Sequence, residues 1–584
     1  MQGLGQSSPV HYGNPFPATD ALGRGLPDQQ DVGGPRKDRY VGLFYWTWHT
    51  GNARTRTGPY DATKILRKKP EAIDDYNDPI WPKGHAPFYW GEPLFGYYQD
   101  TDRWVLRKHA EILADAGVDV VIFDCTNGDL TWRESYMNLC EVWSEARRDG
   151  VKTPYIAFML GLFAQPESLN ALEKLYRNFY QPGRYKDLWF YWKGKPLIMA
   201  YPALLQAVPG DTAETHLRAR IKDFFTFRPG QPAYNVGEQQ PGQWGWLQIY
   251  PQHGFIKLSD GRYEQMPVGV AQNWSEERGL TAMNAPGAFG RSYTDARGQI
   301  NIPGAVNHGY NFQEQWDRAL KLDPEFIFIT GWNEWIAGRY KEWQKQPNAF
   351  PDEFSEERSR DVEPMKGGHK DDYYYQMVAN IRRFKGVLPQ RPASEAKTIA
   401  IDGRFGDWQS VQPEFTAYAG NTLHRNSAGW GKMHYVNTTG RNDLVGAKVA
   451  RDADHLYFYV KTANNLTPPE DSGWMRLFID IDRDHQTGWE GYDFVVNRIS
   501  PGKQALLERS ESGWHWKPVA LVDYAVEGSQ MEIRIPKALL GIKDSVDFEF
   551  KWSDNMQAPG NIMDFWVNGD VAPSGRFNYH YFEH

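Results

Sequence analysis

The hydrophobic pattern divides the chain into two parts with different periodicities. In the first part, eight short apolar runs alternate with segments of helical length. The runs cover residues 40–48, 119–125, 154–160, 196–201, 224–227, 246–250, 268–272 and 326–330. Continuous apolar runs of this length are typical of strands that a parallel sheet buries on both faces. Alternating strands and helices repeated eight times predict an α/β fold, a (β/α)8 TIM barrel.

Helix signals between the runs support this prediction. The segment 102–116 places its apolar residues on one face, and Gly117 then ends it. A capping box from Thr131 to Glu134 predicts the start of the next helix, which runs to Gly150. The helix expected at 371–385 would close the barrel.

In the second part of the chain, from residue 398, short strands separated by turn residues replace the helical pattern. The strands are expected at 456–462, 475–480, 493–497, 504–509, 530–535 and 547–552. They predict a β-sandwich. The expected organisation is therefore an N-terminal extension at 1–38, loosely packed and rich in Gly, Pro and Gln, a barrel at 39–388 and a carbohydrate-binding-module-like sandwich at 389–584.

Composition narrows the range of partners. Phe, Trp and Tyr make up 15% of the chain, an excess that favours aromatic binding surfaces such as those that bind sugars. The net charge of -8 leaves no basic stripe for nucleic acid, and no apolar stretch is long enough to span a membrane. The two cysteines, Cys125 and Cys140, are predicted to be reduced and buried.

The run at 326–330 is followed by Gly331-Trp332-Asn333-Glu334-Trp335, a carboxylate between two indoles at the carboxyl end of a barrel strand. Barrel enzymes place their chemistry there. Apolar walls raise the pKa of a carboxyl group toward neutrality, and indoles stack on sugar rings. The alternative is a loop glutamate paired with an arginine such as Arg339, with both tryptophans in the core.

Other strand ends supply the remaining candidates. Asp124, at the end of the second strand, is the expected second catalytic carboxylate beside Glu334, because glycoside hydrolysis usually needs a pair. Its alternative role is to cap a helix or anchor a loop. The predicted sugar-binding residues are Tyr45, Trp46, His49, Tyr97, Tyr250, His253, Asn273, Trp332, Asn333 and Trp335. His49 and His253 are equally compatible with simple packing. Further loop carboxylates are Glu92, Glu238, Glu264, Glu342, Asp352 and Glu353.

Several of these segments resemble the glycoside hydrolase family 99 and 71 group. They are Phe44-Tyr45-Trp46, 93–97 (Pro-Leu-Phe-Gly-Tyr), 116–120 (Ala-Gly-Val-Asp-Val) and Trp332-Asn333-Glu334-Trp335, and the resemblance covers roughly 38–387. It implies that Glu334 assists the substrate 2-hydroxyl in a neighbouring-group mechanism. The acid/base of that group lies three residues further on, where this chain has Ala337. Either another carboxylate supplies the proton, with Asp124 the expected one, or the reaction differs from that of the endo-α-mannosidases, so the mannoside substrate is not carried over.

The C-terminal part resembles carbohydrate-binding module family 9, through Ile401-Asp402-Gly403, Asp407-Trp408 and the segment 477–482 (Leu-Phe-Ile-Asp-Ile-Asp). Alternating Asp480, Asp482 and Asp484 predict either a structural calcium site or an acidic turn. Candidate sugar-stacking rings in this part are Trp430, Trp489, Trp514 and Trp552, with a core role as the alternative.

These observations predict a glycoside hydrolase that acts as a monomer on a polysaccharide or oligosaccharide and needs no organic cofactor. Motifs for catalytic zinc, phosphate loops and serine nucleophiles are absent from the sequence. The alternatives are a glycan-binding protein on a degenerate barrel, favoured by Ala337, and a polysaccharide lyase that uses Tyr and His. A secreted or periplasmic location is expected, with Met1 in place of a signal peptide.

Overall fold

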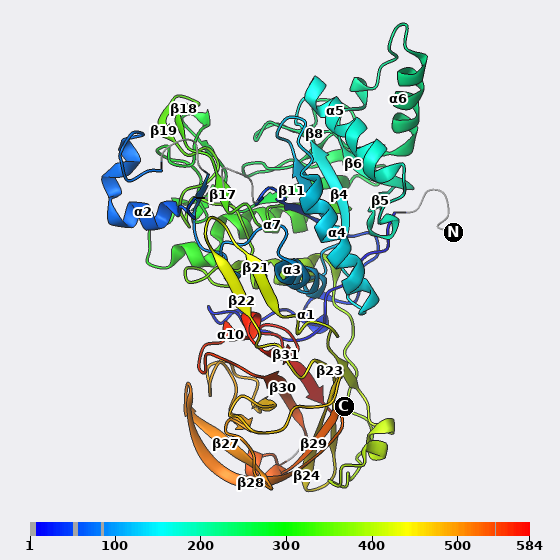
Figure 1. Ribbon diagram of the computed structural model, residues 1–584, viewed down its shortest axis with the longest axis vertical. Coiled ribbons are helices and arrows are strands. Elements are labelled where there is room, and N and C mark those ends of the chain that lie inside the picture. The colour runs from blue at the N-terminus through cyan, green and yellow to red at the C-terminus, as the bar shows by residue number, and fades with distance from the viewer. Residues whose placement is uncertain (1–6, 51–56, 83–86, 544, 584) are drawn as a thin grey trace.

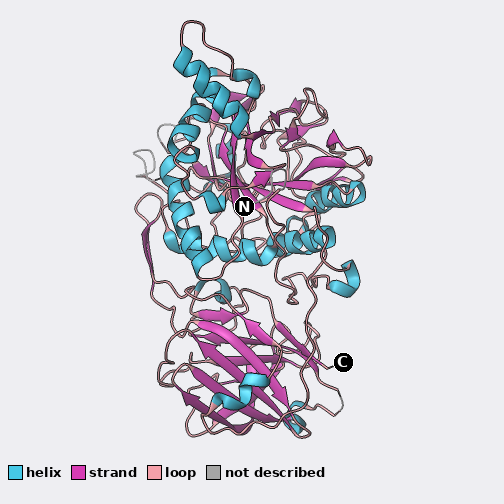
Figure 2. Cartoon of the chain, turned by 90° about the vertical axis from the view of Figure 1, so that its right-hand side faces the viewer, coloured by secondary structure: helices cyan, strands magenta, loops and turns pink. Residues whose placement is uncertain are grey.

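The computed structural model describes residues 7–50, 57–82, 87–543 and 545–583. A mixed α/β part with a curled sheet lies above a β-sandwich (Figure 1). Strands occupy the centre of the upper part and helices its outside, whereas the lower part is almost entirely strands (Figure 2). No described helix has the length and apolar character that crossing a membrane requires. Cys125 and Cys140 are both free and buried, as predicted.

Seven strands of the upper part pair in parallel as a continuous curled sheet. In sheet order they are β11 (Tyr263–Gly269), β16 (Phe326–Thr330), β1 (Tyr40–Tyr45), β3 (Val120–Cys125), β4 (Tyr155–Leu160), β6 (Lys195–Met199) and β7 (Thr226–Phe227). Short antiparallel strands extend it at two places, β10 (Phe255–Lys257) beside β11 and β5 (Tyr191–Trp192) beside β6. The central position of β1, between β16 and β3, matches the order that a barrel requires.

A side-chain amide bridges the remaining gap in the curled sheet. Soon after β7, the strand β8 (Gly230–Gln231) pairs in parallel with β9 (Trp244–Gly245). The Gln265 side chain of β11 then accepts a hydrogen bond from Gly245 N–H at 2.9 Å and donates one to Gly245 C=O at 2.8 Å. The sheet is thus nearly closed, because this amide stands in for backbone pairing between β9 and β11.

The sixth and seventh strands differ from the predicted ones. The run at 246–250 is not a strand, and the seventh strand lies at Tyr263–Gly269 rather than 268–272. The start of β11 is polar in sequence, which hides it from a hydrophobic pattern. Glu264 is nevertheless buried there, because Arg228 pairs with it at 2.6 Å and two indoles donate to it.

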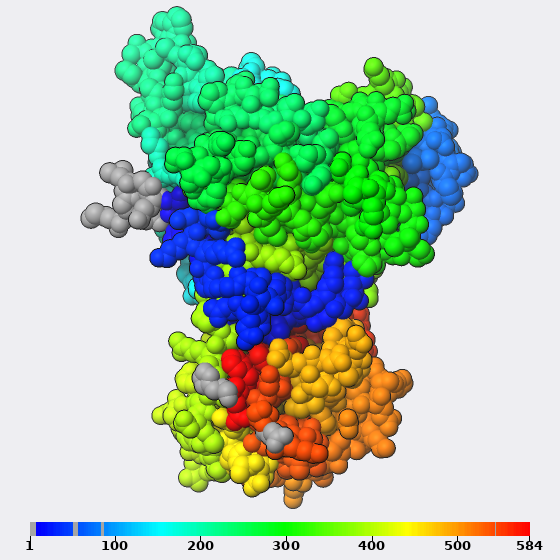
Figure 3. Space-filling model, turned by 180° about the vertical axis from the view of Figure 1, so that it is seen from behind, coloured from blue at the N-terminus to red at the C-terminus, as the bar shows by residue number. Residues whose placement is uncertain are grey.

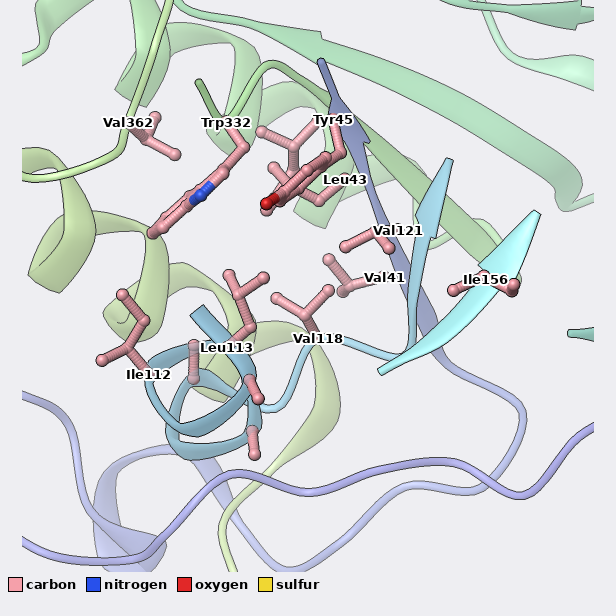
Figure 4. Packing of buried hydrophobic residues seen from close by; sticks show 14 of the residues in the cluster. Val41, Leu43, Tyr45, Ile112, Leu113, Val118, Val121, Ile156, Trp332 and Val362 are labelled. Atoms are coloured by element: carbon pink, nitrogen blue, oxygen red, sulfur yellow. The ribbon is translucent and has the colours of Figure 1, made fainter. Parts of the chain in front are cut away.

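Helices cover the outside of the sheet. They are α3 (Arg103–Ala116), α4 (Arg133–Arg148), α5 (Pro166–Leu175), α6 (Thr212–Phe224), α7 (Tyr310–Leu322) and α8 (Asp372–Lys385). Asp102 caps α3 and Gly117 ends it in a left-handed conformation, as expected. The predicted capping box at Thr131 is wrong, because the N-cap of α4 is Trp132, with no side-chain cap. The thin core between α3 and the sheet includes Val41, Leu43 and Leu113 (Figure 4).

The lower part is one 11-stranded antiparallel system folded around its own core. Its strands are β20 (Glu414–Thr416), β23 (Leu444–Arg451), β24 (His455–Thr462), β25 (Arg476–Asp480), β26 (Phe494–Val496), β27 (Ala505–Ser512), β28 (His515–Glu527), β29 (Gln530–Pro536), β30 (Asp547–Asp554), β31 (Asp570–Ala572) and β32 (Tyr579–Phe582). All six strands expected in this part have counterparts among them. The hydrophobic pattern of the sequence did not predict the long strands β23 and β28. Most of β28 is at least partly exposed on both faces.

Residues 7–38 lie between the two parts and contact both (Figure 3). Arg382 of α8 donates to the carbonyls of Asn14 and Phe16, and Asn578 N–H of the sandwich donates to the carbonyl of Pro17. Direct contacts join the parts as well: Arg576 pairs with Asp371 at 2.8 Å. The interface is therefore polar as well as aromatic, and much of it is buried.

One buried carboxyl group at this interface predicts a pH-dependent stability. Asp115 of α3 accepts hydrogen bonds from Tyr418 and Ser574, and burial raises its pKa to about 6. The folded state then binds the extra proton, so this stabilisation is present below pH ~4 and is lost as the pH rises through about 6. We expect the free energy of unfolding of the wild type, measured by urea denaturation, to fall between these pH limits by on the order of 3 kcal/mol more than that of Asp115→Asn. A pH-independent difference would contradict the assignment.

Candidate active site

A pocket of about 410 Å³ opens at the carboxyl ends of β1, β3 and β16. Its charged lining consists of two buried carboxyl groups, a third on the exposed side, and two buried arginines. Aromatic rings form most of the remaining wall. The pocket lining includes Phe44, Trp46, Trp48, Asp124, Trp132, Trp246, Glu334, Arg339, Tyr340, Asp352, Arg360 and Trp430.

Strand alternation decides which side chains reach this pocket. Along β1 and the residue after it, Phe44 and Trp46 belong to the core inside the curled sheet, whereas Tyr45 belongs to the core beneath the helices. In β3, Ile122 points inward and Phe123 outward, so Asp124 points inward again. The alternation of side chains along each strand thus places Asp124 and Trp46 in the lining of the same pocket.

Glu334 lies opposite a buried arginine. The Arg360 guanidinium donates to Glu334 Oε2 at 2.7 Å and to Asp352 Oδ1 at 3.1 Å, and the Glu334 and Arg360 side chains are only 6% and 2% exposed. The backbone of Glu334 is fixed too, because its N–H donates to Asp361 Oδ1 at 2.6 Å and its carbonyl accepts from the Trp90 indole. The carboxylate therefore has one orientation, toward the pocket.

The electrostatics of this cluster favour proton retention. Burial raises the pKa of Glu334 well above its usual range; Arg360 opposes this shift, whereas Asp352, Asp361 and Asp124 add to it. Burial likewise raises the pKa of Asp124, against hydrogen bonds from the Thr126 N–H and hydroxyl. The pKa of Asp361 rises to about 7 for the same reason. Several carboxyl groups thus surround one arginine, and the cluster holds protons near neutral pH.

Glu353 is the most isolated member of the cluster. Its side chain is buried, and neither carboxyl oxygen has a hydrogen-bond partner among the described residues. Burial and the nearby Glu334 raise its pKa well above the usual range. These causes favour the neutral form of Glu353, which does not line the pocket.

The tryptophans and the asparagine of the Trp332–Trp335 motif lie behind the pocket and position its wall. Trp335 stacks on Trp90 with 4.5 Å between ring centroids, and Trp332 is buried in the core beneath the helices (Figure 4). The Asn333 amide accepts from Trp46 N–H at 2.9 Å and donates to Tyr98. The alternative in which both tryptophans are core residues is correct. The arginine that pairs with Glu334 is Arg360, not Arg339, which binds backbone carbonyls near Tyr76.

A fully buried network supports these residues from below. Glu363 accepts from Trp335 and Tyr98 and pairs with His109 Nε2 at 2.8 Å. His109 Nδ1 in turn lies 2.8 Å from the Tyr45 hydroxyl. Tyr45 was expected to bind sugar, but its outward position in β1 makes it part of this network instead.

The other predicted sugar binders are also outside the described pocket lining. His49 is buried against Asp100, Tyr97 donates to Asp61, and His253 contacts Gln248. Asn273 is buried and accepts from the Tyr234 hydroxyl at 2.6 Å, and Tyr250 is half-buried beyond the wall. Of the twelve residues expected at the site, the pocket brings together Glu334, Asp124 and Trp46.

Sequence reasoning missed several residues of the wall. Trp48 and Trp132 are stacked with centroids 6.4 Å apart, and Trp246 and Tyr340 add further rings. Trp48 stands two residues after Trp46, so strand alternation alone could have found it. Arg360 carries no signal, because it lies in a long loop with no periodicity.

In the sandwich, the candidate stacking rings have different positions. Trp552 is core, Trp489 and Trp514 pack against one another with centroids 4.4 Å apart, and Trp430 lines the pocket that contains Glu334 and Asp124. Asp480 and Asp482 come together with Asp493, not with Asp484, and offer oxygens within 4.8 Å of one another. That spacing suits calcium, yet the Thr487 hydroxyl also lies within hydrogen-bond distance of both Asp482 and Asp493 and can donate to either, as in an acidic turn.

The chain matches no protein-family model and no curated protein. Among solved structures it is similar to the GH99 endo-α-mannosidase of Bacteroides thetaiotaomicron, with 14% identity and a TM-score of 0.36, covering 60% of this chain and 98% of that one. The same enzyme in complex with bis-tris-propane gives 12% identity and a TM-score of 0.33, covering 60% and 97%.

Proposed function

We propose that the chain is a glycoside hydrolase and that Glu334 and Asp124 are its catalytic carboxyl groups. The observation that carries the proposal is the pocket itself, in which two buried carboxyl groups with raised pKa values face a cavity walled by indoles. A site of this composition suits a sugar ring, because the rings contact its C–H faces while the carboxyls manage protons. The resemblance of the sequence to family 99 points the same way.

The environments of the two carboxyl groups divide the roles. Glu334 touches Arg360, whose charge opposes the rise that burial causes in the pKa of Glu334 and so stabilises its carboxylate form. That form can take a proton from a substrate hydroxyl or a water. Among the described residues, Asp124 has only Thr126 as a hydrogen-bond partner, and its raised pKa suits an acid that protonates the leaving oxygen. No organic cofactor enters this division of labour.

A polymeric or oligomeric substrate is part of the proposal. The pocket shares Arg339 and Tyr340 with an open hollow of about 900 Å³, which leaves room for further sugar units. We also propose that the nearly closed sheet is a (β/α)8 barrel with β7–β8 as its fifth strand and β9 as its sixth. We further propose that the protein is a secreted or periplasmic monomer, because a polymeric substrate could then reach the opening of the pocket.

One observation favours a second candidate, a glycan-binding protein without turnover. Ala337, at the position where family 99 carries its acid/base, is buried in β17 (Ile336–Ala337), paired with β2 (Phe88–Tyr89). No acid can be supplied from there. A lyase is disfavoured, because no histidine is among the described residues that line the pocket.

The test is release of reducing sugar from a panel of defined polysaccharides, with near-ultraviolet absorbance recorded to detect lyase products. On a substrate found in this way, Asp124→Asn is expected to lower kcat by about 100-fold, because the amide keeps the Thr126 contacts without donating a proton. Thr126→Val, which removes only the hydroxyl partner, is the matched control and should retain most activity. Sugar binding without turnover on any member of the panel would favour the second candidate.

A further inference from the structure

A β-hairpin of the C-terminal part crosses to the barrel. It consists of β21 (Arg425–Ala428) and β22 (His434–Asn437), and Figure 1 shows it in yellow, rising from the sandwich in front of α3. Its two faces differ, since Arg425 is buried and Tyr435 half-buried, while Asn426, His434 and Val436 are exposed. The hairpin therefore has one face on the barrel and one in solvent.

The strongest attachment is made by Arg425. Its guanidinium binds Asp102, the cap of α3, through Nε at 2.8 Å and Nη2 at 2.7 Å. The same group lies between the Trp104 and Tyr435 rings, at 5.1 and 4.3 Å from their centroids. Both nitrogens approach the same carboxylate oxygen, Asp102 Oδ2, and this ion pair between two rings fixes the hairpin to the start of a barrel helix.

The tip of the hairpin is held by the barrel loop before α3. The Tyr435 hydroxyl accepts from Tyr97 N–H at 2.8 Å, and its ring covers Gly96, where a Cβ would lie 2.6 Å from ring atoms. Gln99 donates to the Gly429 carbonyl at 2.7 Å, and Trp430 N–H donates to the Tyr97 carbonyl at 2.7 Å. The peptide unit that joins Gly429 to Trp430 is thus held by barrel residues on both its carbonyl and its N–H.

These contacts deliver Trp430 to the catalytic pocket. Its indole is 1% exposed, packs edge-on against Tyr89 with centroids 5.5 Å apart, and lines the pocket on the same cavity as Glu334 and Asp124. It belongs to the cluster that contains Trp90 and Trp335, which fix the backbone around Glu334. No other residue of the C-terminal part is among the described residues that line this pocket.

We propose that Trp430 is a substrate-contacting, specificity-determining residue that the C-terminal part supplies to the barrel site. An indole in the wall of a sugar-sized cavity offers an apolar face to the C–H surface of a pyranose beside the cleaved bond. Arg425 and Tyr435 are then positioning residues that hold the arm in place. The C-terminal part therefore contributes to substrate binding in the pocket of its own chain's barrel, in addition to any binding it does elsewhere. This inference rests on the proposed hydrolase function.

The experiment compares Trp430→Ala, Trp430→Phe and Val436→Ala in the full chain, on a polysaccharide that the wild type cleaves. Trp430→Ala should raise KM about tenfold, the loss of one ring contact, with a smaller change in kcat. Trp430→Phe should recover most of this loss. Val436→Ala, on the solvent face of the same hairpin, should match the wild type. Arg425→Met should raise KM as Trp430→Ala does and make the hairpin sensitive to limited proteolysis.

The outcomes separate this inference from the proposed function. Normal KM in both Trp430 variants, with wild-type turnover, overturns the inference and leaves the hydrolase proposal standing. An equal fall in kcat for folded Ala and Phe variants, without a KM change, overturns it too. Thermal unfolding identifies a variant that fails to fold. If Trp430→Ala does not fold, the KM of Trp430→Phe decides whether the inference holds. No turnover and no binding of any glycan by the wild type overturns both proposals.

Discussion

Glu334→Gln is expected to lower kcat by about 100-fold or more while leaving the fold unchanged. The amide oxygen can still accept from Arg360 Nη2, and the Glu334 backbone bonds to Asp361 and Trp90 are independent of the side chain. What is lost is the negative charge and the ability to take a proton. The measurement is the initial rate of reducing-sugar release, with circular dichroism and thermal unfolding as checks on the fold.

Asp352→Asn is the matched control for this prediction. Asp352 binds the same guanidinium from the exposed side of the pocket, with its side chain 39% exposed, so its charge is well solvated. A small effect at Asp352 together with a large one at Glu334 would separate catalysis from general electrostatics. Near-normal turnover in Glu334→Gln would remove Glu334 from the catalytic pair.

Much of the sheet was predictable because buried parallel strands leave a signal that needs no partner. The runs that became β1, β3, β4 and β16 are apolar apart from Asp124 and Thr330 near their ends, so their burial follows from composition. The seventh strand failed for the opposite reason. Glu264 and Gln265 are compatible with a buried strand only because Arg228 and the Gly245 backbone satisfy them. Those partners are distant in sequence.

The site was predictable only in part, for a geometric reason. A strand end supplies inward and outward side chains in turn, and the prediction treated them as one group. Alternation from Phe44 onward places Trp46 and Trp48 at the pocket and Tyr45 behind it. Applied to β3, the same rule selects Asp124. The pattern of strand positions therefore contained more information about the site than the aromatic composition did.

Other parts of the site depend on contacts that no local pattern encodes. Arg360 and Asp361 reach Glu334 because their segment pairs with Gly331 and Trp332, through Gly331 N–H to the Arg360 carbonyl and Glu363 N–H to the Trp332 carbonyl. Trp430 arrives from the C-terminal part by way of a hairpin. The sequence of this hairpin is that of an ordinary amphipathic hairpin, and its role at the pocket follows only from its contacts with the loop before α3.

Arg360→Met is expected to give the largest loss of stability, on the order of 3–5 kcal/mol at pH 8, because it leaves buried carboxyl groups without their cation. Arg360 is 2% exposed and bonds both Glu334 and Asp352. Without Arg360, the pKa of Glu334 in the folded state rises further, because the Arg360 charge lowers it. A raised pKa means that stability is kept at low pH and lost as the pH rises, so the deficit should shrink at pH 5. Urea denaturation followed by tryptophan fluorescence at both pH values measures this loss of stability.

The double variant Arg360→Met/Glu334→Gln is the control, because the neutral amide needs no cation. Its loss of stability at pH 8 should be well below the sum of the losses in the two single variants. Additive losses, or a deficit independent of pH, would mean that Arg360 stabilises the fold through packing and not by balancing the catalytic carboxylate.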